Sequence, residues 1–372
     1  MTLILLCVLV CAYTYVGYPV LVVLLARWFP ATSAPVQSPS PPTVTVCLPV
    51  HDGARWLARK LASLQAQRYP AERLEIWVYA DGCDDETVEI GRRISEQDAR
   101  VRVLVGPVRA GKPTALNRLR EVASGEILVL TDVRQPLDPG CVAALVGALA
   151  DPGIACVSGD LRTAGASGAG IYSRYEARIR RAEARFRGMI GMNGPIYALR
   201  RADLPELPAD TILDDVWVPM RLRLGGRRLA LCEDAIAYDE AFDDAREFRR
   251  KVRTLAGNYQ LFARMPELLS PLHNPSWFET VSHKLLRLVC PWALIVLALA
   301  TPVQVLASWH DDSAEAWFVR GVALALSLAA GLALLGGRAG APGRAARSFV
   351  VMNAAAIVGL WRFVRGTQAV TW

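Results

Sequence analysis

The chain carries no charged side chain from Met1 to Ala26, and this run constrains its fold more than any other feature. The first charge is Arg27. Because about 20 apolar helical residues cross a bilayer core, the run predicts a transmembrane helix over residues 1–27. A secretory signal peptide is the alternative, but its apolar core is usually about 7–15 residues long and follows basic residues. No basic residue precedes this run, so we favour the transmembrane helix.

Three further apolar runs lie near the C-terminus. Residues 288–309 and 321–337 are uncharged and have the length of a membrane span. Residues 348–361 are too few for an independent span and predict a tilted, re-entrant or interfacial segment. We therefore expect C-terminal transmembrane or re-entrant helices over residues 288–372. An amphipathic interfacial segment is expected just before them, over residues 263–287.

The composition shows that a water-soluble domain accompanies these helices. Of the 372 residues, 53% are hydrophobic and the mean hydropathy is +0.25, yet 21% are charged, which is too many for a chain wholly inside a membrane. The net charge of +7 suits anionic lipid or a phosphorylated substrate. The eight cysteines form no CxxC and no zinc spacing, so we expect free thiols in a reducing compartment.

The charges beside the apolar runs predict an orientation. Arg27 and Arg338 flank the first and third runs, whereas residues 310–315 between the second and third runs are acidic and lack lysine and arginine. Basic segments favour the cytoplasmic side, so the N-terminus is expected outside and the central domain in the cytoplasm, at the inner (plasma) membrane. Residues 28–42 are rich in proline and serine and predict a linker.

The central region, residues 43–262, alternates between predicted strands and helices. The strands are expected at 43–49, 74–80, 101–105 and 126–131, and the helices between them at 55–68, 87–94 and 115–122. This alternation predicts an α/β domain with a mostly parallel sheet. Ligands bind beyond the carboxyl ends of such strands, which here carry His51, Asp52, Asp81 and Asp132. Neither GxGxxG after the first strand nor GxxxxGK[ST] occurs, which argues against dinucleotide-binding and P-loop proteins.

Five ordered sequence elements carry a resemblance to a known family. They are Pro49-Val50-His51-Asp52, Asp81-Gly82-Cys83-Asp84-Asp85-Glu86-Thr87, Gly111-Lys112-Pro113-Thr114-Ala115-Leu116-Asn117, Leu130-Thr131-Asp132-Val133-Arg134 and Leu213-Asp214-Asp215. The set resembles the family 2 glycosyltransferases, which have the nucleotide-sugar-binding GT-A fold. It looks most like the membrane-anchored branch that includes cellulose, chitin and hyaluronan synthases.

The resemblance implies the reaction and the donor site. It implies inverting, metal-dependent transfer of a sugar from a UDP-sugar to a hydroxyl of a glycan or glycolipid, for cell-surface polysaccharide. Asp81 and Lys112 would hold the uracil, with His51 stacked on it and Asp52 beside it. Asp132 would bind Mg²⁺ or Mn²⁺, which both prefer oxygen ligands.

Two arginine-bearing elements depart from the family pattern. Arg134 stands where the third residue of the DxD motif is usually aspartate, and it is expected to touch phosphate or a sugar hydroxyl. Residues 249–257 resemble the QxxRW motif of processive synthases, with Arg250 in place of Gln and Thr254 in place of Trp. Arg250 and Arg253 would bind the diphosphate. The missing Trp leaves room for single-sugar transfer, or for another aromatic such as Tyr259 at the acceptor.

Asp215 is the candidate general base. The resemblance assigns it this role, and the adjacent Asp214 would raise one carboxyl pKa by repulsion, which suits a base. The alternative is an N-cap of a helix over residues 216–224. Asn193 and Gly194 resemble the acceptor-side loop of the family.

Three alternatives stay open from the sequence. One is a single-addition transferase that acts on a polyprenyl or other lipid-linked acceptor. Another is a non-catalytic membrane scaffold with a degenerate sugar-nucleotide fold. Nucleic-acid binding by the arginine-rich helix at residues 171–187 is the third, but a solvated or interfacial helix face is favoured, so no nucleic-acid partner is expected. With so few spans, export of a polymer would need a second copy of the chain or a partner.

Overall fold

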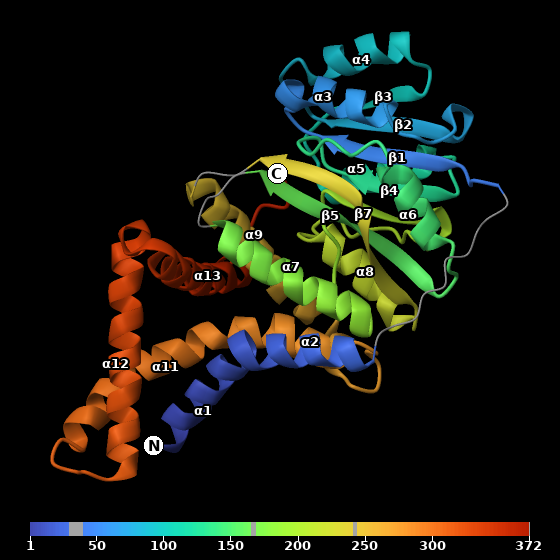
Figure 1. Cartoon of the computed structure of the whole chain (residues 1–372). Coiled ribbons are helices and arrows are strands. Elements are labelled where there is room, and N and C mark those ends of the chain that lie inside the picture. Colours follow the sequence, from blue (N-terminus) through green and yellow to red (C-terminus); the bar gives the residue numbers. More distant parts are fainter. Residues whose placement is uncertain (30–39, 165–168, 241–243, 372) are drawn as a thin grey trace.

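The structure is a computed structural model, and it describes residues 1–29, 40–164, 169–240 and 244–371. It consists of an α/β domain and a group of apolar helices that extend from one side of that domain (Figure 1). The predicted linker over residues 28–42 falls largely outside the described residues.

A seven-stranded sheet forms the centre of the α/β domain. Its order is β3-β2-β1-β4-β6-β5-β7. The strands are β1 (Val44–Val50), β2 (Leu74–Asp81), β3 (Val101–Gly106), β4 (Ile127–Thr131), β5 (Ile154–Ala164), β6 (Ile196–Arg200) and β7 (Arg228–Glu240). Only β6 runs antiparallel to its neighbours β4 and β5, so the predicted mostly parallel sheet is confirmed.

The strand β1 lies in the interior of the sheet because its side chains, apart from Thr45, are apolar on both faces. All seven of its residues are buried, as expected for a parallel strand covered by helices on both sides. It pairs in parallel with β2 and β4, so the carboxyl ends of all three strands meet at one edge. His51, Asp81 and Asp132 therefore lie at the same edge, as predicted.

Helices cover the two faces of the sheet. They are α3 (Ala54–Gln65), α4 (Thr87–Gln97), α5 (Lys112–Val122), α6 (Cys141–Leu149), α7 (Ala169–Phe186), α8 (Asp214–Leu224) and α9 (Asp244–Arg264). The amphipathic α3 shows why they pack there: Leu57, Leu61 and Leu64 recur at helical spacing and are fully buried against the sheet.

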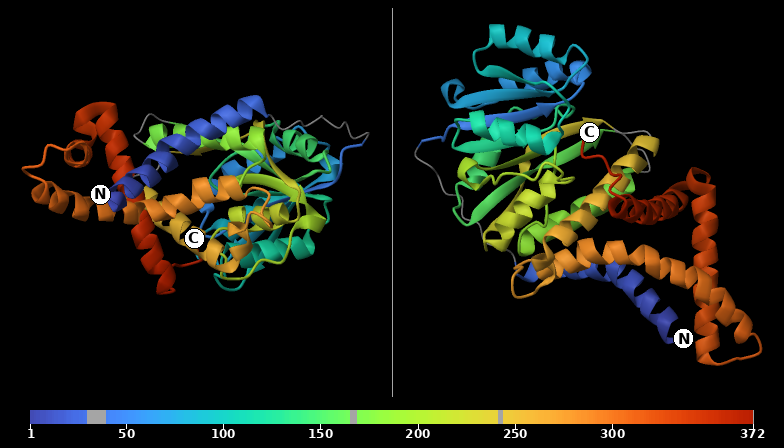
Figure 2. Two further views of the ribbon diagram at one scale, coloured as in Figure 1. Left: turned by 90° about the horizontal axis from the view of Figure 1, so that it is seen from below. Right: turned by 180° about the vertical axis from the view of Figure 1, so that it is seen from behind.

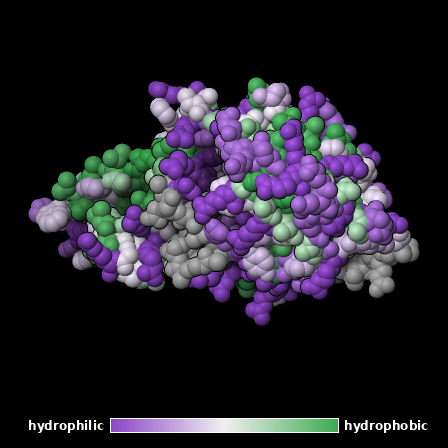
Figure 3. All heavy atoms as spheres, turned by 90° about the horizontal axis from the view of Figure 1, so that it is seen from above, coloured by the Kyte–Doolittle hydropathy of each residue, from purple (hydrophilic) through white to green (hydrophobic). Residues whose placement is uncertain are grey.

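Three helical stretches of the described chain are long and apolar enough to cross a membrane: Thr2–Trp28, Trp277–Ala307 and Ala314–Val364. They contain α1 (Thr2–Ala12), α2 (Tyr18–Trp28), α10 (Trp277–Glu279), α11 (Leu286–Ala307), α12 (Ala314–Leu335) and α13 (Gly340–Val364), with π-helical segments at Tyr13–Gly17 (η1) and Thr280–Leu285 (η5). Many of their large apolar side chains are exposed, and Figure 3 shows apolar atoms gathered on the protruding helices beside a mostly hydrophilic α/β domain. Such a surface is suited to lipid.

The last apolar run differs from the sequence prediction in its extent. It is part of the 25-residue helix α13, which turns away from α12 and packs along α9 (Figures 1 and 2). The contact is close at Gly359, where an added Cβ would lie 3.0 Å from the backbone nitrogen of Ala256 and 3.2 Å from the carbonyl oxygen of Val252. The helix therefore joins the apolar group to the α/β domain.

The arginine-rich helix α7 is not simply solvated or interfacial, because one of its faces is buried against α2. Glu183 on this face is 0% exposed. The Tyr18 hydroxyl donates to its Oε1 over 2.5 Å, and Nδ1 of His283, in η5, lies 2.6 Å from the same oxygen. A buried carboxylate is stable only when it is paired in this way. Glu183 thus links the N-terminal helix to the segment that leads into α11.

Candidate active site

The carboxylate of Asp81 fixes the turn that precedes α5. Asp81 is 1% exposed, and its two oxygens accept hydrogen bonds from the backbone N–H groups of Ala110 (2.8 Å) and Gly111 (2.7 Å). Gly111 has a φ of +92°, a conformation that favours glycine, and it caps the helix that begins at Lys112. Asp81 therefore orients Lys112, while its predicted contact with uracil stays a prediction.

Lys112 lies between two carboxylates. Its ammonium nitrogen is 2.9 Å from Oδ1 of Asp132 and 3.3 Å from Oδ2 of Asp214, and the lysine is mostly buried. Burial alone would lower the lysine pKa, but attraction to Asp132, Asp214 and Asp215 outweighs it and raises the pKa above its usual range. Lys112 thus stays charged. It joins Asp132, at the DxD position, to Asp214, beside the candidate base, although these two residues are far apart in the sequence.

Lys60 holds the turn that carries Asp132 by bonding to a residue on each side of it. This lysine of α3 is 0% exposed and donates to Thr131 Oγ1 (2.7 Å) and to the Gln135 carbonyl oxygen (2.6 Å). Desolvation lowers its pKa to about 7, against the opposing attraction of Asp132. Our sequence reasoning missed Lys60, although a lysine on the apolar face of a helix was a usable signal.

Asp214 and Asp215 form the first turn of α8. The N-cap position belongs to Leu213, so neither carboxylate is the N-cap that the alternative interpretation required. The buried Tyr197 hydroxyl donates to Asp214 Oδ2 over 3.1 Å. Burial and repulsion from Asp214 raise the pKa of Asp215 to about 6, although Lys112 and Lys284 act in the opposite direction. A carboxylate with this pKa can take a proton near neutral pH.

The loop from Gly191 to Gly194 lies against Asp215. A Cβ added at Gly194 would lie 2.8 Å from Asp215 Oδ2, and the backbone N–H of Met192 donates to the Asp215 carbonyl oxygen over 2.8 Å. Asn193 is anchored through its amide to the Gly159 carbonyl oxygen (2.6 Å). The structure thus places Asn193 and Gly194, the predicted acceptor loop, beside the predicted base.

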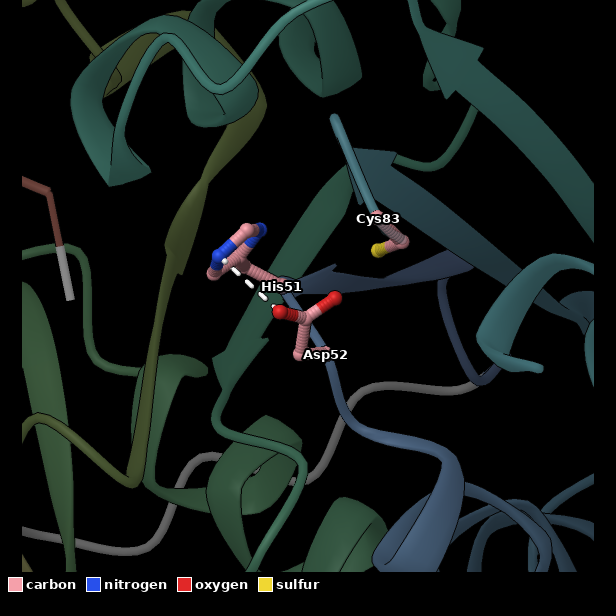
Figure 4. A group of neighbouring side chains, drawn as sticks. All are labelled: His51, Asp52 and Cys83. Atoms are coloured by element: carbon pink, nitrogen blue, oxygen red, sulfur yellow. Dashed lines mark ion pairs between the residues drawn. The ribbon is translucent and has the colours of Figure 1, made fainter. Parts of the chain in front are cut away.

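His51 and Asp52 lie at the end of β1, on the Asp81 side of the site (Figure 4). Nδ1 of His51 is 2.8 Å from the Asp81 carbonyl oxygen, and Nε2 is 3.4 Å from Asp52 Oδ2. Asp52 has a φ of +45° and accepts a hydrogen bond from the Asp84 N–H. His51 is thereby held at the site edge, next to the turn that Asp81 orients.

The predicted arginines and Tyr259 occupy different surroundings. Arg253 donates to the carbonyl oxygen of Ile212, which precedes Asp214 by two residues, over 3.1 Å. Its buried Nε has no hydrogen-bond partner among the described residues. Arg134 is half-buried and follows Asp132 by two residues. Arg250 is instead exposed and paired with Glu247.

Tyr259 is directed away from the carboxylates. Its hydroxyl lies 3.3 Å from the Leu288 carbonyl oxygen, and its ring stacks on Phe363 of α13 at 6.4 Å. Neither Arg250 nor Tyr259 therefore joins the group around Lys112, and their predicted roles stay predictions.

Comparisons with known proteins agree with this geometry. The sequence profile of the family described as "Glycosyl transferase family 2" matches residues 45–203. The glycosyltransferase AglD of Haloferax volcanii is 37% identical over 105 residues, which are 27% of this chain and 16% of AglD. The glycosyltransferase AglE of the same organism is 28% identical over 141 residues, 37% of this chain and 45% of AglE. The matches thus span less than half the length of these curated relatives.

A solved structure resembles almost the whole chain. The mannosyltransferase PcManGT from Pyrobaculum calidifontis, in complex with GDP-Man and Mn²⁺, has a TM-score of 0.77 and 25% sequence identity, and the match covers 97% of this chain and 99% of that one. The similarity therefore includes the apolar helices as well as the α/β domain.

The chain has the GT-A fold, and Lys112, Asp132 and Asp214 meet at the carboxyl edge of its sheet. Residues 45–203 are similar to the family 2 glycosyl transferases, and the whole chain is similar in fold to a solved mannosyltransferase. The comparisons do not confirm the predicted membership of the cellulose, chitin and hyaluronan synthase branch.

Proposed function

We propose that the protein transfers a sugar, with inversion, from a nucleoside-diphosphate sugar to a hydroxyl group of an acceptor at the membrane surface. The observation that carries this proposal is the position of Asp215, a carboxylate with a pKa near 6 beside the Asn193–Gly194 loop and the Lys112–Asp132 pair. The orientation that we propose has the α/β domain in the cytoplasm and the N-terminus outside.

Asp215 acts as the general base. The acceptor O–H bond breaks as its proton moves to Asp215, and the acceptor oxygen bonds to the anomeric carbon of the sugar. The bond between that carbon and the diphosphate breaks at the same time, and its electron pair leaves with the diphosphate. Attack from the side opposite to the leaving group inverts the anomeric centre. Arg253, whose buried Nε has no hydrogen-bond partner among the described residues, binds the diphosphate.

Asp132 fits a divalent cation. A third of its side chain is exposed, and its oxygen donors suit Mg²⁺ and Mn²⁺. It is the one aspartate of the DxD position, since Arg134 occupies the other, so the donor diphosphate would supply further oxygen ligands to a bound cation. A bound cation would neutralise charge on the departing diphosphate. Lys60 keeps the Asp132 turn in place for this contact.

The donor base is the part of the proposal that is easiest to test. The sequence resemblance favours UDP, whereas the similar mannosyltransferase structure contains GDP-Man. Purified protein should be screened against UDP-sugars and GDP-sugars for release of the nucleoside diphosphate, with Mn²⁺, with Mg²⁺ and with a chelator. Release that needs a metal and an acceptor supports the proposal, and its absence with every donor contradicts it.

Asp215→Asn tests the base directly. The amide keeps the shape but accepts no proton, so transfer should fall about 10²–10⁴-fold while nucleotide affinity stays nearly unchanged. Glu121→Gln is the matched control, because Glu121 is an exposed carboxylate paired with Arg118 on α5. Retained turnover in Asp215→Asn would remove Asp215 from its role.

A second candidate, single addition to a lipid-linked acceptor, is favoured by two cations beside Asp215. Lys284 Nζ lies 3.5 Å from where a Cβ at Gly191 would be, and Arg180 donates to Asn193 Oδ1. Among the described residues, neither cation lies within 4 Å of a carboxylate oxygen. Because Lys284 belongs to the segment that enters α11, an anionic group of a membrane lipid would meet both cations.

The length of the product distinguishes the two candidates. Vesicles that contain the protein and bacterial-type lipid acceptors should be incubated with a radiolabelled donor. Addition of one labelled sugar per acceptor supports the lipid-linked candidate, whereas a ladder of longer products supports polysaccharide synthesis.

A further inference from the structure

Three side chains of different chemistry meet where β1 and β2 end. His51 and Asp52 directly follow β1, and Cys83 lies in the loop after β2. Their ligand atoms, an imidazole nitrogen, a carboxylate oxygen and a sulfur, all lie within 4.8 Å of one another (Figure 4). The two strands are parallel neighbours, so the fold itself brings these loops together.

The imidazole of His51 is held in the tautomer that a metal requires. Its Nδ1 lies 2.8 Å from the Asp81 carbonyl oxygen, and a carbonyl only accepts, so Nδ1 carries the hydrogen. Nε2 lies 3.4 Å from Asp52 Oδ2, so a cation bound by both atoms would take the lone pair of Nε2. A histidine ligand with its second nitrogen hydrogen-bonded to a backbone carbonyl is the usual arrangement in metal sites.

The carboxylate of Asp52 is also oriented. Its Oδ1 accepts from the Asp84 N–H over 3.0 Å, which leaves Oδ2 directed at His51. Among the described residues, Asp52 is the one non-glycine residue with a positive φ, at +45°. Such a conformation costs an aspartate about 1 kcal/mol, and it persists here because the surrounding contacts hold it.

The spacing suits a small cation after a modest contraction. Three points that are no more than 4.8 Å apart all lie within a circle whose radius is at most that distance divided by the square root of three, about 2.8 Å. Zinc bonds are about 2.0 Å to nitrogen and 2.3 Å to sulfur. The ligand atoms would have to move inward by about 0.5–0.8 Å to reach these bond lengths, and rotation of the Cys83 and Asp52 side chains can supply that movement.

The thiol of Cys83 has a ready route to coordination. Its Sγ lies 3.5 Å from the Val50 carbonyl oxygen, as a thiol that donates a weak hydrogen bond. Burial raises the Cys83 pKa, so the thiol is protonated without a cation, and a bound metal would displace that proton. Mixed nitrogen, oxygen and sulfur ligands favour zinc-like ions over Mg²⁺ or Mn²⁺, which prefer oxygen alone.

We propose that His51, Asp52 and Cys83 form a second cation site, for a zinc-like divalent ion, distinct from the Asp132 position. Asp52 is 44% exposed, so solvent reaches the fourth coordination position. Resting on the proposed function, an ion here would hold His51 away from the nucleotide base and reduce donor binding. The site would make the enzyme sensitive to free zinc.

Cobalt(II) spectroscopy tests the site without any assay of transfer. Co²⁺ added to the purified full-length protein should give a near-ultraviolet thiolate-to-cobalt band that saturates at one equivalent. Cys83→Ser should abolish this band, whereas Cys232→Ser, at another partly buried cysteine, should keep it. Asp132→Asn should keep it as well. No band in the wild type, or a band that survives Cys83→Ser, would overturn the proposal.

Thiol labelling covers the case in which Cys83→Ser does not fold. Zn²⁺ should protect Cys83 of the wild-type protein from iodoacetamide at least tenfold, as measured on the Cys83 peptide by mass spectrometry. The Cys232 peptide serves as the internal control. Equal labelling of Cys83 with and without Zn²⁺ would contradict the site.

The effect on donor binding needs its own measurement. Zn²⁺ should raise the donor KM of the wild type in the presence of Mn²⁺, and Cys83→Ser should relieve most of this inhibition. Inhibition that persists in Cys83→Ser would show that Zn²⁺ acts at Asp132 and would overturn the regulatory part. If no donor is turned over at all, the proposed function fails, while the cobalt and labelling experiments still decide the site.

Discussion

The carboxylate of Asp215 fills the space into which any side chain at Gly194 would project. An added Cβ would lie 2.8 Å from Asp215 Oδ2 and 3.4 Å from its Cγ. Real Cβ atoms do not approach an oxygen this closely, so either the carboxylate or the loop would have to move. The glycine is therefore a requirement of the base position.

We expect Gly194→Ala to lower kcat about tenfold or more, because a displacement of even 1 Å at the reacting centre can cost about 10²-fold. The donor KM should change little, since Asp81 and Gly111 lie elsewhere in the site. Gly147→Ala is the control, because a Cβ at Gly147 meets nothing within 4 Å. Steady-state kinetics of both variants check this, and an unchanged kcat in Gly194→Ala would contradict the tight fit.

The pH dependence of transfer should report Asp215. A general base works only when deprotonated, and the Asp215 pKa is raised to about 6 by burial and by Asp214. We therefore expect kcat/KM to be level above pH 7 and to fall about tenfold per pH unit well below pH 6. The profile should be measured at saturating metal. A flat profile down to pH 5 would exclude Asp215 as the titrating group.

Removal of the Lys112 charge should move the acidic fall of kcat/KM to higher pH. The Lys112 cation lowers the Asp215 pKa, so Lys112→Gln should raise that pKa and make Asp215 harder to deprotonate. Lys112→Arg, which keeps the charge, should leave this fall near its wild-type position. The comparison of the three pH profiles checks the sign, and a shift to lower pH in Lys112→Gln would refute it.

The close contact between α9 and α13 should depend on Gly359. Gly359→Ala places a Cβ 3.0 Å from the Ala256 backbone nitrogen, so we expect a loss of about 1–3 kcal/mol and a lower midpoint of thermal unfolding in detergent. Gly331→Ala on α12, where nothing lies within 4 Å, should leave the midpoint unchanged. Equal midpoints for both variants would show that the helices separate freely.

Local sequence patterns predicted much of the donor half of the fold. Strands β1 to β4 and the helices between them match their predicted positions within a few residues, because apolar runs and strand-end aspartates mark each unit. The second half was harder to predict. The strand β6 enters the sheet antiparallel between β4 and β5, and no local pattern states which strands a five-residue segment will join.

In the site, too, local motifs could be read from the sequence, whereas contacts between distant residues could not. The motifs of Asp132 and Asp215 placed both residues in the candidate site, and their roles stay predictions. The contact of Lys112 with Asp214 was not predictable, because it joins residues 102 positions apart. Lys60 and Tyr197 were missed for a similar reason, since each acts through a hydrogen bond to a partner distant in sequence. The burial of Glu183 could not be predicted either, because its partners Tyr18 and His283 lie 165 and 100 residues away in the sequence.

Glu183 would set a geometric limit on the acceptor in the proposed reaction. Through Tyr18 and His283 it links the α/β domain to two of the apolar helices. The proposed transfer would therefore take place at one fixed height above the lipid headgroups. For the proposed reaction, the acceptor hydroxyl would have to lie at that level, neither among the headgroups nor far out on a long glycan. The distance between the lipid anchor and the acceptor hydroxyl would thus limit which acceptors the protein can use, independently of the sugar itself.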